Sequence, residues 1–148
     1  MEETAAAVNQ EIQLVAFNLG AEEYAIDILS VQEINRVLPI TRIPNAPHYV
    51  VGVINLRGNV IPVIDLHQRL NIQTQENTEQ TRIIILKVGE MVAGIIVDGV
   101  TEVLKLEGEQ IEEASNIATS VDNEFLLGVG KLEERLIILL NLEKVLEV

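Results

Sequence analysis

Apolar residues along this chain gather in short runs instead of spreading along one face of a long helix. Seven runs are rich in Ile, Val and Leu and are separated by Gly, Pro, Asn and charged residues: 14–19, 24–29, 50–56, 60–66, 83–88, 92–97 and 136–142. Runs of this length and composition are typical of strands in a sandwich or barrel. The pattern therefore predicts an all-β protein.

Turn and helix signals fall between these runs. Residues 20–23 and the pair Gly89-Glu90 each separate two runs at hairpin distance. Pro62 cannot donate a ladder hydrogen bond, so its strand is predicted to lie at an edge or beside a bulge. Short helices are predicted after three capping residues, the last of which opens a C-terminal helix over residues 142–148: Ser30, Asp65 and Asn141.

The two halves of the chain resemble each other when one is laid over the other. A shift of 69 residues places Glu33 on Glu102, and a shift of 76 residues places Gly52 on Gly128. Many apolar positions between these pairs coincide as well. The repeat predicts two similar small barrels packed together, with a groove and pseudo-symmetry between them.

The domain organisation follows from this repeat. We predict a first barrel over residues 11–76 and a second over residues 77–148, and exchange of strands between them stays open. Residues 1–10 have no periodic apolar face and are expected to form a flexible tail. Residues 73–80 contain no apolar side chain, so they are predicted to be a linker or an exposed loop.

Composition excludes several classes of protein. The net charge of −13 would repel phosphate backbones, and only two Phe and two Tyr are present to stack on bases, so we expect no nucleic-acid binding. The absence of cysteine excludes disulfides and thiolate metal sites and suits a reducing compartment. No apolar stretch approaches the roughly 18 residues that cross a bilayer. The sequence predicts a cytoplasmic protein.

The charge is unevenly distributed. From Arg36 to Arg69 the four arginines outnumber the single acid Asp65, which gives a local balance of +3. Residues 88–148 carry a balance of −9. This basic island (Arg36, Arg42, Arg57 and Arg69) is either incidental to solubility or a surface that meets an acidic partner.

Catalytic and metal-binding patterns are sparse. His48 and His67 are the only histidines and have no metal-ligand spacing. Three acids, Asp27, Asp65 and Asp98, are candidates for a carboxylate pair, but a sugar cleft would also need aromatic platforms. We therefore expect no catalytic residue, no cofactor and no metal. An acid-dependent hydrolase and a small-ligand binding barrel remain as alternatives.

Residues 52–66 carry the most informative motif. Two apolar strands flank residues 55–59, so Arg57 is predicted to lie at a hairpin turn where Gly58 and Asn59 take positive φ. Its guanidinium should project into solvent. Arg57 is then either a generic turn residue or part of a recognition surface.

At this motif the chain resembles the CheW family, the coupling (adaptor) proteins of bacterial chemotaxis. The Asn-Leu-Arg-Gly core within residues 52–66 is a specific signal of this family. Further matching blocks occur in the same order along the chain, so the resemblance extends from Gln13 onward. The other blocks are residues 22–29 leading into 31–34, residues 94–100, and the tail 128–146.

The resemblance implies both a fold and partners. The fold would be two SH3-like five-stranded β-barrels with short helices. The function would be that of a non-catalytic adaptor, which links the cytoplasmic tip of methyl-accepting receptors to the regulatory domain of the chemotaxis histidine kinase, CheA. Contact with the membrane would be indirect, through receptor arrays. A receiver-fused coupling protein or a kinase fragment would be expected to carry additional sequence.

The resemblance also implies site residues. Six would contact the receptor: Val31, Glu33, Asn55, Arg57, Gly58 and Val103. Aliphatic anchors rimmed by charges suit a helical hairpin held in a groove, although core packing is the alternative for the two valines. Ile117 is isolated in a polar stretch and is a candidate contact for the kinase or for ring formation. A small satellite core is the alternative for that residue.

Overall fold

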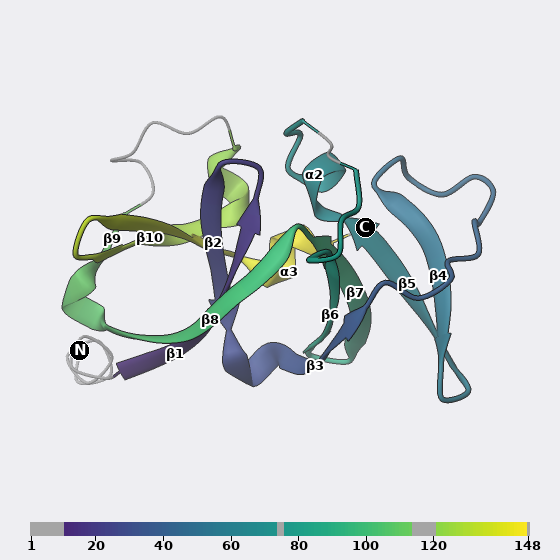
Figure 1. Cartoon of the computed structure of the whole chain (residues 1–148), viewed down its shortest axis with the longest axis horizontal. Helices are drawn as coiled ribbons and strands as arrows, with labels where there is room; N and C mark the ends of the chain where they lie inside the picture. Colours follow the sequence, from purple (N-terminus) through teal and green to yellow (C-terminus); the bar gives the residue numbers. More distant parts are fainter. Residues whose placement is uncertain (1–10, 74–75, 114–120, 148) are drawn as a thin grey trace.

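The computed structural model describes residues 11–73, 76–113 and 121–147. Within them the protein is built from two sheets (Figure 1). The six-stranded sheet has the order β8-β1-β2-β11-β10-β9 and comprises β1 (Glu11–Leu19), β2 (Glu22–Asp27), β8 (Gly99–Glu107), β9 (Ile111–Glu112), β10 (Leu126–Leu132) and β11 (Arg135–Leu140). The five-stranded sheet has the order β3-β6-β7-β5-β4 and comprises β3 (Val31–Arg36), β4 (Val50–Leu56), β5 (Asn59–Asp65), β6 (Arg82–Val88) and β7 (Met91–Val97).

Short helices connect these strands and close the ends of the sheets. They are the 3-10 helices η1 (Ile28–Ser30), η2 (Gly108–Gln110) and η4 (Asn123–Phe125), and the α-helices α2 (Leu66–Arg69) and α3 (Leu142–Val145). The predicted all-β class is therefore confirmed. No helix among the described residues is long and apolar enough to span a membrane.

Each sheet contains strands from both halves of the chain. β1 and β2 pair with β8 and β11, and β6 and β7 pair with β3 and β5. The predicted boundary between residues 76 and 77 lies in the connection from α2 to β6, so it does not separate the two sheets. Residues 31–97 supply the five-stranded sheet, and the segments on either side of them supply the other.

The predicted repeat is present at the level of elements. β1 to β5 of the first half correspond in order to β6, β7, β8, β10 and β11 of the second, and α2 corresponds to α3. The bulge in β4 between Val50 and Gly52 recurs in β10 between Leu126 and Gly128. The two sheets therefore share one topology, and each takes its central hairpin, β1–β2 or β6–β7, from the other half of the chain. The two-residue β9 adds the sixth strand.

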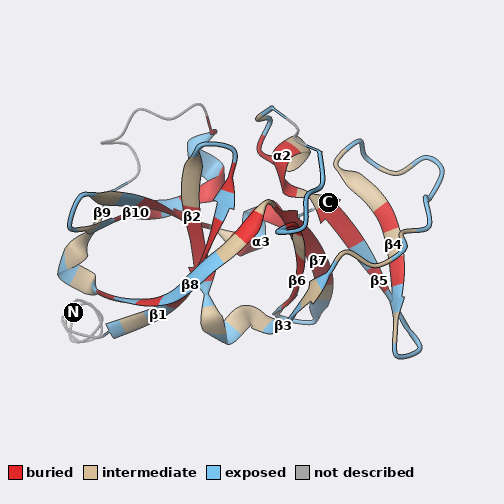
Figure 2. Ribbon diagram, viewed as in Figure 1, coloured by how far each residue is buried: buried red, intermediate tan, exposed pale blue. Residues whose placement is uncertain are grey.

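Three apolar clusters stabilise this arrangement. One lies within the six-stranded sheet, one within the five-stranded sheet, and a larger central cluster joins both. Along β1, Leu14 and Ala16 face the first cluster while Val15 and Phe17 face the central one. Strands buried on both faces read as continuous apolar runs, which explains the sequence pattern (Figure 2). Each sheet curls around its own cluster, as expected for two small packed barrels.

The helix predictions have mixed outcomes. Asp65 and Asn141 cap α2 and α3 as predicted, although α3 ends at Val145 instead of extending to residue 148. The prediction at Ser30 is wrong because Asp27 caps η1 and the chain then continues as β3. Pairing of β3 with β6 outweighs the local capping signal at Ser30.

The prediction for Pro62 allowed an edge strand or a position beside a bulge, and the structure shows the bulge. β5 lies between β4 and β7, so it is not an edge strand. Pairing with β7 begins only at Val63, one residue beyond the proline, and the β4 bulge lies opposite Val63 and Ile64. The proline is therefore placed beside a bulge, as expected for a residue that cannot donate a ladder hydrogen bond.

Two other predicted segments are only partly described. The expected tail, residues 1–10, lies outside the described residues, as do residues 74–75 of the predicted linker. Residues 76–80 of that linker are exposed. They connect α2 to β6, so they form a loop associated with the five-stranded sheet and do not link separate barrels.

Candidate functional site

The β4–β5 hairpin presents Arg57 at its tip. Leu56 pairs with Asn59 at the end of the ladder, and the two turn residues Arg57 and Gly58 have φ values of 51° and 86°. Two successive positive φ values are typical of a tight hairpin turn. The prediction located positive φ at Gly58 and Asn59, one residue too far along. Asn55 Oδ1 accepts a hydrogen bond of 3.0 Å from Gly58 N, which fixes the turn.

Glu33 holds the Arg57 side chain across the five-stranded sheet. Arg57 Nη2 donates to Glu33 Oε2 in an ion pair, and Asn35 Nδ2 donates to Glu33 Oε1 at 2.9 Å. Glu33 lies on β3 and Arg57 follows β4, which are the two outer strands of this sheet. The pair therefore joins the two edges. The Arg57 side chain is still 70% exposed, so its outer face is accessible to a partner.

Electrostatics keep this pair charged. The hydrogen bond from Arg57 lowers the pKa of Glu33, and the hydrogen bond from Asn35 adds to this effect, while desolvation opposes it. A carboxylate that accepts charge-assisted hydrogen bonds stays ionised. Glu33 consequently orients the guanidinium of Arg57.

The two predicted aliphatic contacts lie in different environments. Val31 is half-buried and packs against the central cluster, whereas Val103 on β8 is 56% exposed. Val103 lies on the six-stranded sheet, while Val31, Glu33 and the hairpin residues lie on or beside the five-stranded sheet. The structure thus brings together Glu33, Asn55, Arg57 and Gly58, and adds Val31 at the start of the same strand as Glu33.

Sequence reasoning missed several exposed apolar residues, of which Ile34 is the one related by the repeat to a predicted contact. Ile34 on β3 is 40% exposed, and the shift of 69 residues relates it to Val103. Ile34 and Val103 are thus matching outward positions on the outer strands β3 and β8. The repeat itself carried the signal that would have identified Ile34. Ile117, the predicted kinase or ring contact, lies outside the described residues.

The acids considered for catalysis have structural partners. Asp27 Oδ1 accepts from Leu29 N at 2.9 Å, Asp65 Oδ1 accepts from His67 N at 3.0 Å, and Asp98 Oδ2 accepts from Gly20 N at 2.7 Å. Each carboxylate thereby satisfies a backbone amide at a turn or helix start. Within residues 11–73, 76–113 and 121–147, no group of three His, Cys, Asp or Glu side chains has the arrangement of a metal site.

Half of the basic island is engaged internally. Arg57 pairs with Glu33, and Arg69 donates hydrogen bonds to carbonyls at the end of α3. Arg36 and Arg42 are exposed. The arginines therefore do not form one uniform surface for an acidic partner, and Arg57 is the member whose position on a hairpin tip best suits recognition.

These features define a class of protein. Asp27, Asp65 and Asp98 accept hydrogen bonds from backbone amides, and the exposed pair of Arg57 and Glu33 lies at a hairpin tip, an arrangement that suits a binding surface. The CheW-like domain model matches residues 13–148. The chain therefore belongs to the CheW-like family.

Relatives and a solved structure agree with this assignment. The chemotaxis protein CheW of Klebsiella aerogenes is 46% identical over 134 residues, which cover 90% of this chain and 81% of that protein. CheW of Bacillus subtilis is 36% identical over 135 residues, covering 91% and 86%. The crystal structure of the scaffolding protein TtCheW from Thermoanaerobacter tengcongensis superposes with a TM-score of 0.86 at 37% identity and covers 94% of this chain and 90% of that one. The protein is a scaffold of chemotaxis signalling and not an enzyme.

Proposed function

We propose that this protein couples the cytoplasmic tip of methyl-accepting chemotaxis receptors to the regulatory domain of the kinase CheA. Receptor binding would use Glu33, Arg57 and the turn residues Asn55 and Gly58, with Val31 and Val103 as aliphatic contacts. Recruitment to membrane receptor arrays would follow from this binding. Membership of a chemotaxis scaffold family supports the proposal.

One observation carries the receptor part of the proposal. Arg57 is oriented by Glu33 and by a hydrogen-bonded turn, yet its side chain remains 70% exposed. A pre-oriented guanidinium loses less conformational freedom on binding than a mobile one. Arg57 is not part of the core, so its exposed guanidinium is free to contact a helical hairpin tip.

The test is a titration of the purified protein with a receptor-tip fragment and with the CheA regulatory domain, separately and together. We expect Arg57→Glu to weaken receptor binding at least tenfold, because a reversed charge at an oriented contact is strongly unfavourable. Binding of the CheA domain should persist. The melting temperature should fall by no more than a few degrees, since an exposed ion pair contributes little to stability and the new carboxylate would repel Glu33 only weakly in solvent.

Lys131→Glu provides a matched control. Lys131 is an exposed base on β10 and forms an exposed ion pair of 3.1 Å with Glu112, but it is not one of the proposed receptor contacts. Its charge reversal should leave receptor binding within about twofold. Equal loss of binding in the two variants would point to general electrostatics, and parallel loss of receptor and kinase binding in Arg57→Glu would reveal a structural role. Either result would contradict the assignment of Arg57.

The double variant Glu33→Arg with Arg57→Glu separates orientation from charge. It can rebuild the ion pair with reversed polarity, so stability should be close to that of the wild type. Receptor binding should remain weak, because the outward charge has the wrong sign. Recovery of wild-type binding would mean that the pair only holds the two edges of the five-stranded sheet together. The kinase or ring contact at Ile117 stays a prediction, to be tested with Ile117→Asp in the kinase titration.

A further inference from the structure

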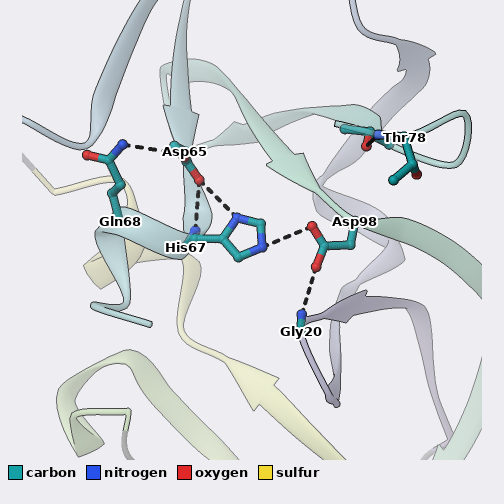
Figure 3. A network of polar contacts seen from close by, with 7 residues as sticks. Gly20, Asp65, His67, Gln68, Thr78 and Asp98 are labelled. Atoms are coloured by element: carbon teal, nitrogen blue, oxygen red, sulfur yellow. Dashed lines mark hydrogen bonds and ion pairs between the residues drawn. The ribbon is translucent and has the colours of Figure 1, made fainter. Parts of the chain in front are cut away.

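A buried histidine lies between two carboxylates where the two sheets meet. His67, the second residue of α2, is 2% exposed. Its Nδ1 lies 3.1 Å from Asp65 Oδ1 in a hydrogen bond, and its Nε2 lies 2.9 Å from Asp98 Oδ1 (Figure 3). The second contact is close enough for an ion pair but lacks the alignment of a hydrogen bond, so the contact of the buried Nε2 with Asp98 is electrostatic. Both ring nitrogens therefore face an acidic oxygen.

These contacts connect elements of both sheets. Asp65 ends β5 and His67 lies in α2, both beside the five-stranded sheet. Asp98 lies between β7 and β8, where the chain passes from one sheet to the other. Its Oδ2 accepts from Gly20 N at 2.7 Å in the β1–β2 turn, and its own N donates to Asn18 O at 3.0 Å. The contacts thus run from α2 through Asp98 to the β1–β2 hairpin of the six-stranded sheet.

The ring needs two protons to satisfy this arrangement. A neutral imidazole has one N–H donor and one acceptor nitrogen, so it can donate to one carboxylate only. The other carboxylate would then face a nitrogen lone pair. An imidazolium has an N–H on both nitrogens, and its positive charge is favoured by two partly buried acids, whose side chains are 13% and 23% exposed.

We propose that His67 is a proton-dependent clamp between the two sheets. With both nitrogens protonated, it holds Asp65 and Asp98 together and fixes Asp98 against the Gly20 turn. When the ring loses one proton, the attraction between His67 and Asp98 is lost. The β1–β2 turn, which is hydrogen-bonded to Asp98, is then no longer connected to α2 through His67.

The surrounding charges favour the clamped state. The hydrogen bond with Asp65 raises the pKa of His67 against the opposing effect of burial, and Asp98 raises it further. Burial acts to raise the pKa of Asp65, but hydrogen bonds and charge from His67 outweigh burial and lower it. No other ionised side chain among the described residues faces the ring: Asp65 comes from β5 and Asp98 from the β7–β8 junction, Gln68 on α2 is neutral, and the β1–β2 turn contributes only the amide of Gly20.

The pH dependence has a definite sign. Because the pKa of His67 is raised on folding, its stabilising contribution is complete below about pH 6.5, the usual histidine value, and is lost as pH rises through the raised pKa. Because the pKa of Asp65 is lowered, its contribution is present above about pH 4 and is lost as pH falls through the lowered pKa. The clamp therefore contributes most between about pH 4 and pH 6.5.

The direct test is an NMR titration of the whole protein. His48→Gln removes the only other histidine, which is exposed, and leaves His67 as the single imidazole signal. We expect the His67 ring to titrate above about pH 6.5 and the amide of Gly20 to shift with the same midpoint. A midpoint at or below about 6.5, or a Gly20 amide that does not follow the ring, would overturn the proposal.

Variants test the two carboxylate contacts. Asp98→Asn keeps an oxygen acceptor for Gly20 but removes the charge, so the His67 midpoint should fall. Asp27→Asn is the matched control, since Asp27 also accepts a backbone amide but faces no histidine. It should leave the midpoint unchanged. The same fall in both variants, or no fall in Asp98→Asn, would remove Asp98 from the clamp.

A stability comparison supplies an independent readout. The urea midpoint of the wild type should exceed that of His67→Gln at pH 6, and the difference should shrink as pH rises through the His67 titration. A difference that stays constant across this range would mean that His67 contributes only packing. The wild-type NMR titration still tests the clamp if His67→Gln does not fold.

Discussion

At the scale of single residues, Arg69 connects the two halves of the chain through aromatic contacts and hydrogen bonds. Its guanidinium carbon lies 4.4 Å from the ring centroid of Tyr49 and 4.9 Å from that of Phe125. It donates to the carbonyls of Val145, Lys144 and Glu147, each at 2.8 Å. Tyr49 and Phe125 are related by the shift of 76 residues, so one arginine is shared by the two equivalent aromatic positions. The planar guanidinium also neutralises the C-terminal end of α3.

Replacing Arg69 with lysine should therefore be costly although the charge is kept. A lysine cannot stack as a plane or donate in a fixed fork to several carbonyls. We expect Arg69→Lys to lower the free energy of unfolding by roughly 1.5–3 kcal/mol, the range for hydrogen bonds that involve charged groups. Urea denaturation followed by circular dichroism measures this. Arg42→Lys, an exposed substitution, is the control; equal stability of the two variants would show that the Arg69 contacts contribute little.

At the scale of elements, two glycines allow the outer segments to pair closely with β4 and β10. Thr41 and Val53 exchange backbone hydrogen bonds of 2.8 Å, and Glu112 pairs with Val129 in the equivalent place on β10. A Cβ on Gly52 would collide with the Thr41 carbonyl, and one on Gly128 would lie 2.7 Å from the Glu112 carbonyl oxygen. The segments at Thr41 and Glu112 can therefore pair with β4 and β10 only because Gly52 and Gly128 have no side chain.

This contact predicts an order of stabilities for alanine variants. Gly52→Ala must displace backbone, so we expect it to destabilise by more than about 2 kcal/mol. Gly89→Ala in the β6–β7 turn is the control: its added Cβ meets nothing within 4 Å, and its φ of 61° alone should cost about 1 kcal/mol. Thermal and urea unfolding give the comparison. If Gly52→Ala were no less stable than Gly89→Ala, the close approach of the Thr41 carbonyl would not be what requires glycine at position 52.

At the scale of the whole molecule, the two sheets depend on each other for their strands. The β1–β2 hairpin completes a sheet whose other strands lie after residue 98, and β6 and β7 complete a sheet whose other strands lie before residue 66. The central cluster draws on both sheets. Neither half of the sequence therefore contains all the strands of either sheet.

Fragments cut between residues 76 and 77 should consequently be unfolded when separate. Each would leave sheet edges and apolar faces exposed. Mixing fragments 1–76 and 77–148 should restore the β-sheet signal in circular dichroism and a cooperative thermal transition. Fragment 77–148 extended at its N-terminus by residues 64–76 serves as a length control and should stay unfolded alone. Cooperative unfolding of either isolated half would contradict the exchanged topology.

Local sequence was sufficient for much of the fold. Continuous Ile, Val and Leu runs identified strands buried on both faces, and Gly20 and Gly89 marked the hairpins between them. Strands with fewer apolar residues, such as β3 and β8, were not recognised as runs because their outward positions are polar and charged. The repeat pointed to equivalent elements but left their distribution between sheets open, because either arrangement preserves the same pattern.

The site divides in the same way. Sequence placed Arg57 on a turn and Asp65 at a helix start, since turn and cap preferences involve only neighbouring residues. It could not show that Glu33 orients Arg57, 24 residues away, or that Asp98 meets His67 and Gly20. Those contacts depend on which strands lie side by side.

The amino-acid order by itself determined the β class, the duplicated plan, the main hairpins and the family. Tertiary structure alone decided that the β1–β2 and β6–β7 hairpins each join the sheet of the other half. It also decided that Arg69 contacts both Tyr49 and Phe125, and that His67 lies between Asp65 and Asp98. The physical reason is range: strand propensity and turn chemistry act between neighbours along the chain, whereas pairing, burial and charge compensation act between residues that only the folded chain brings together.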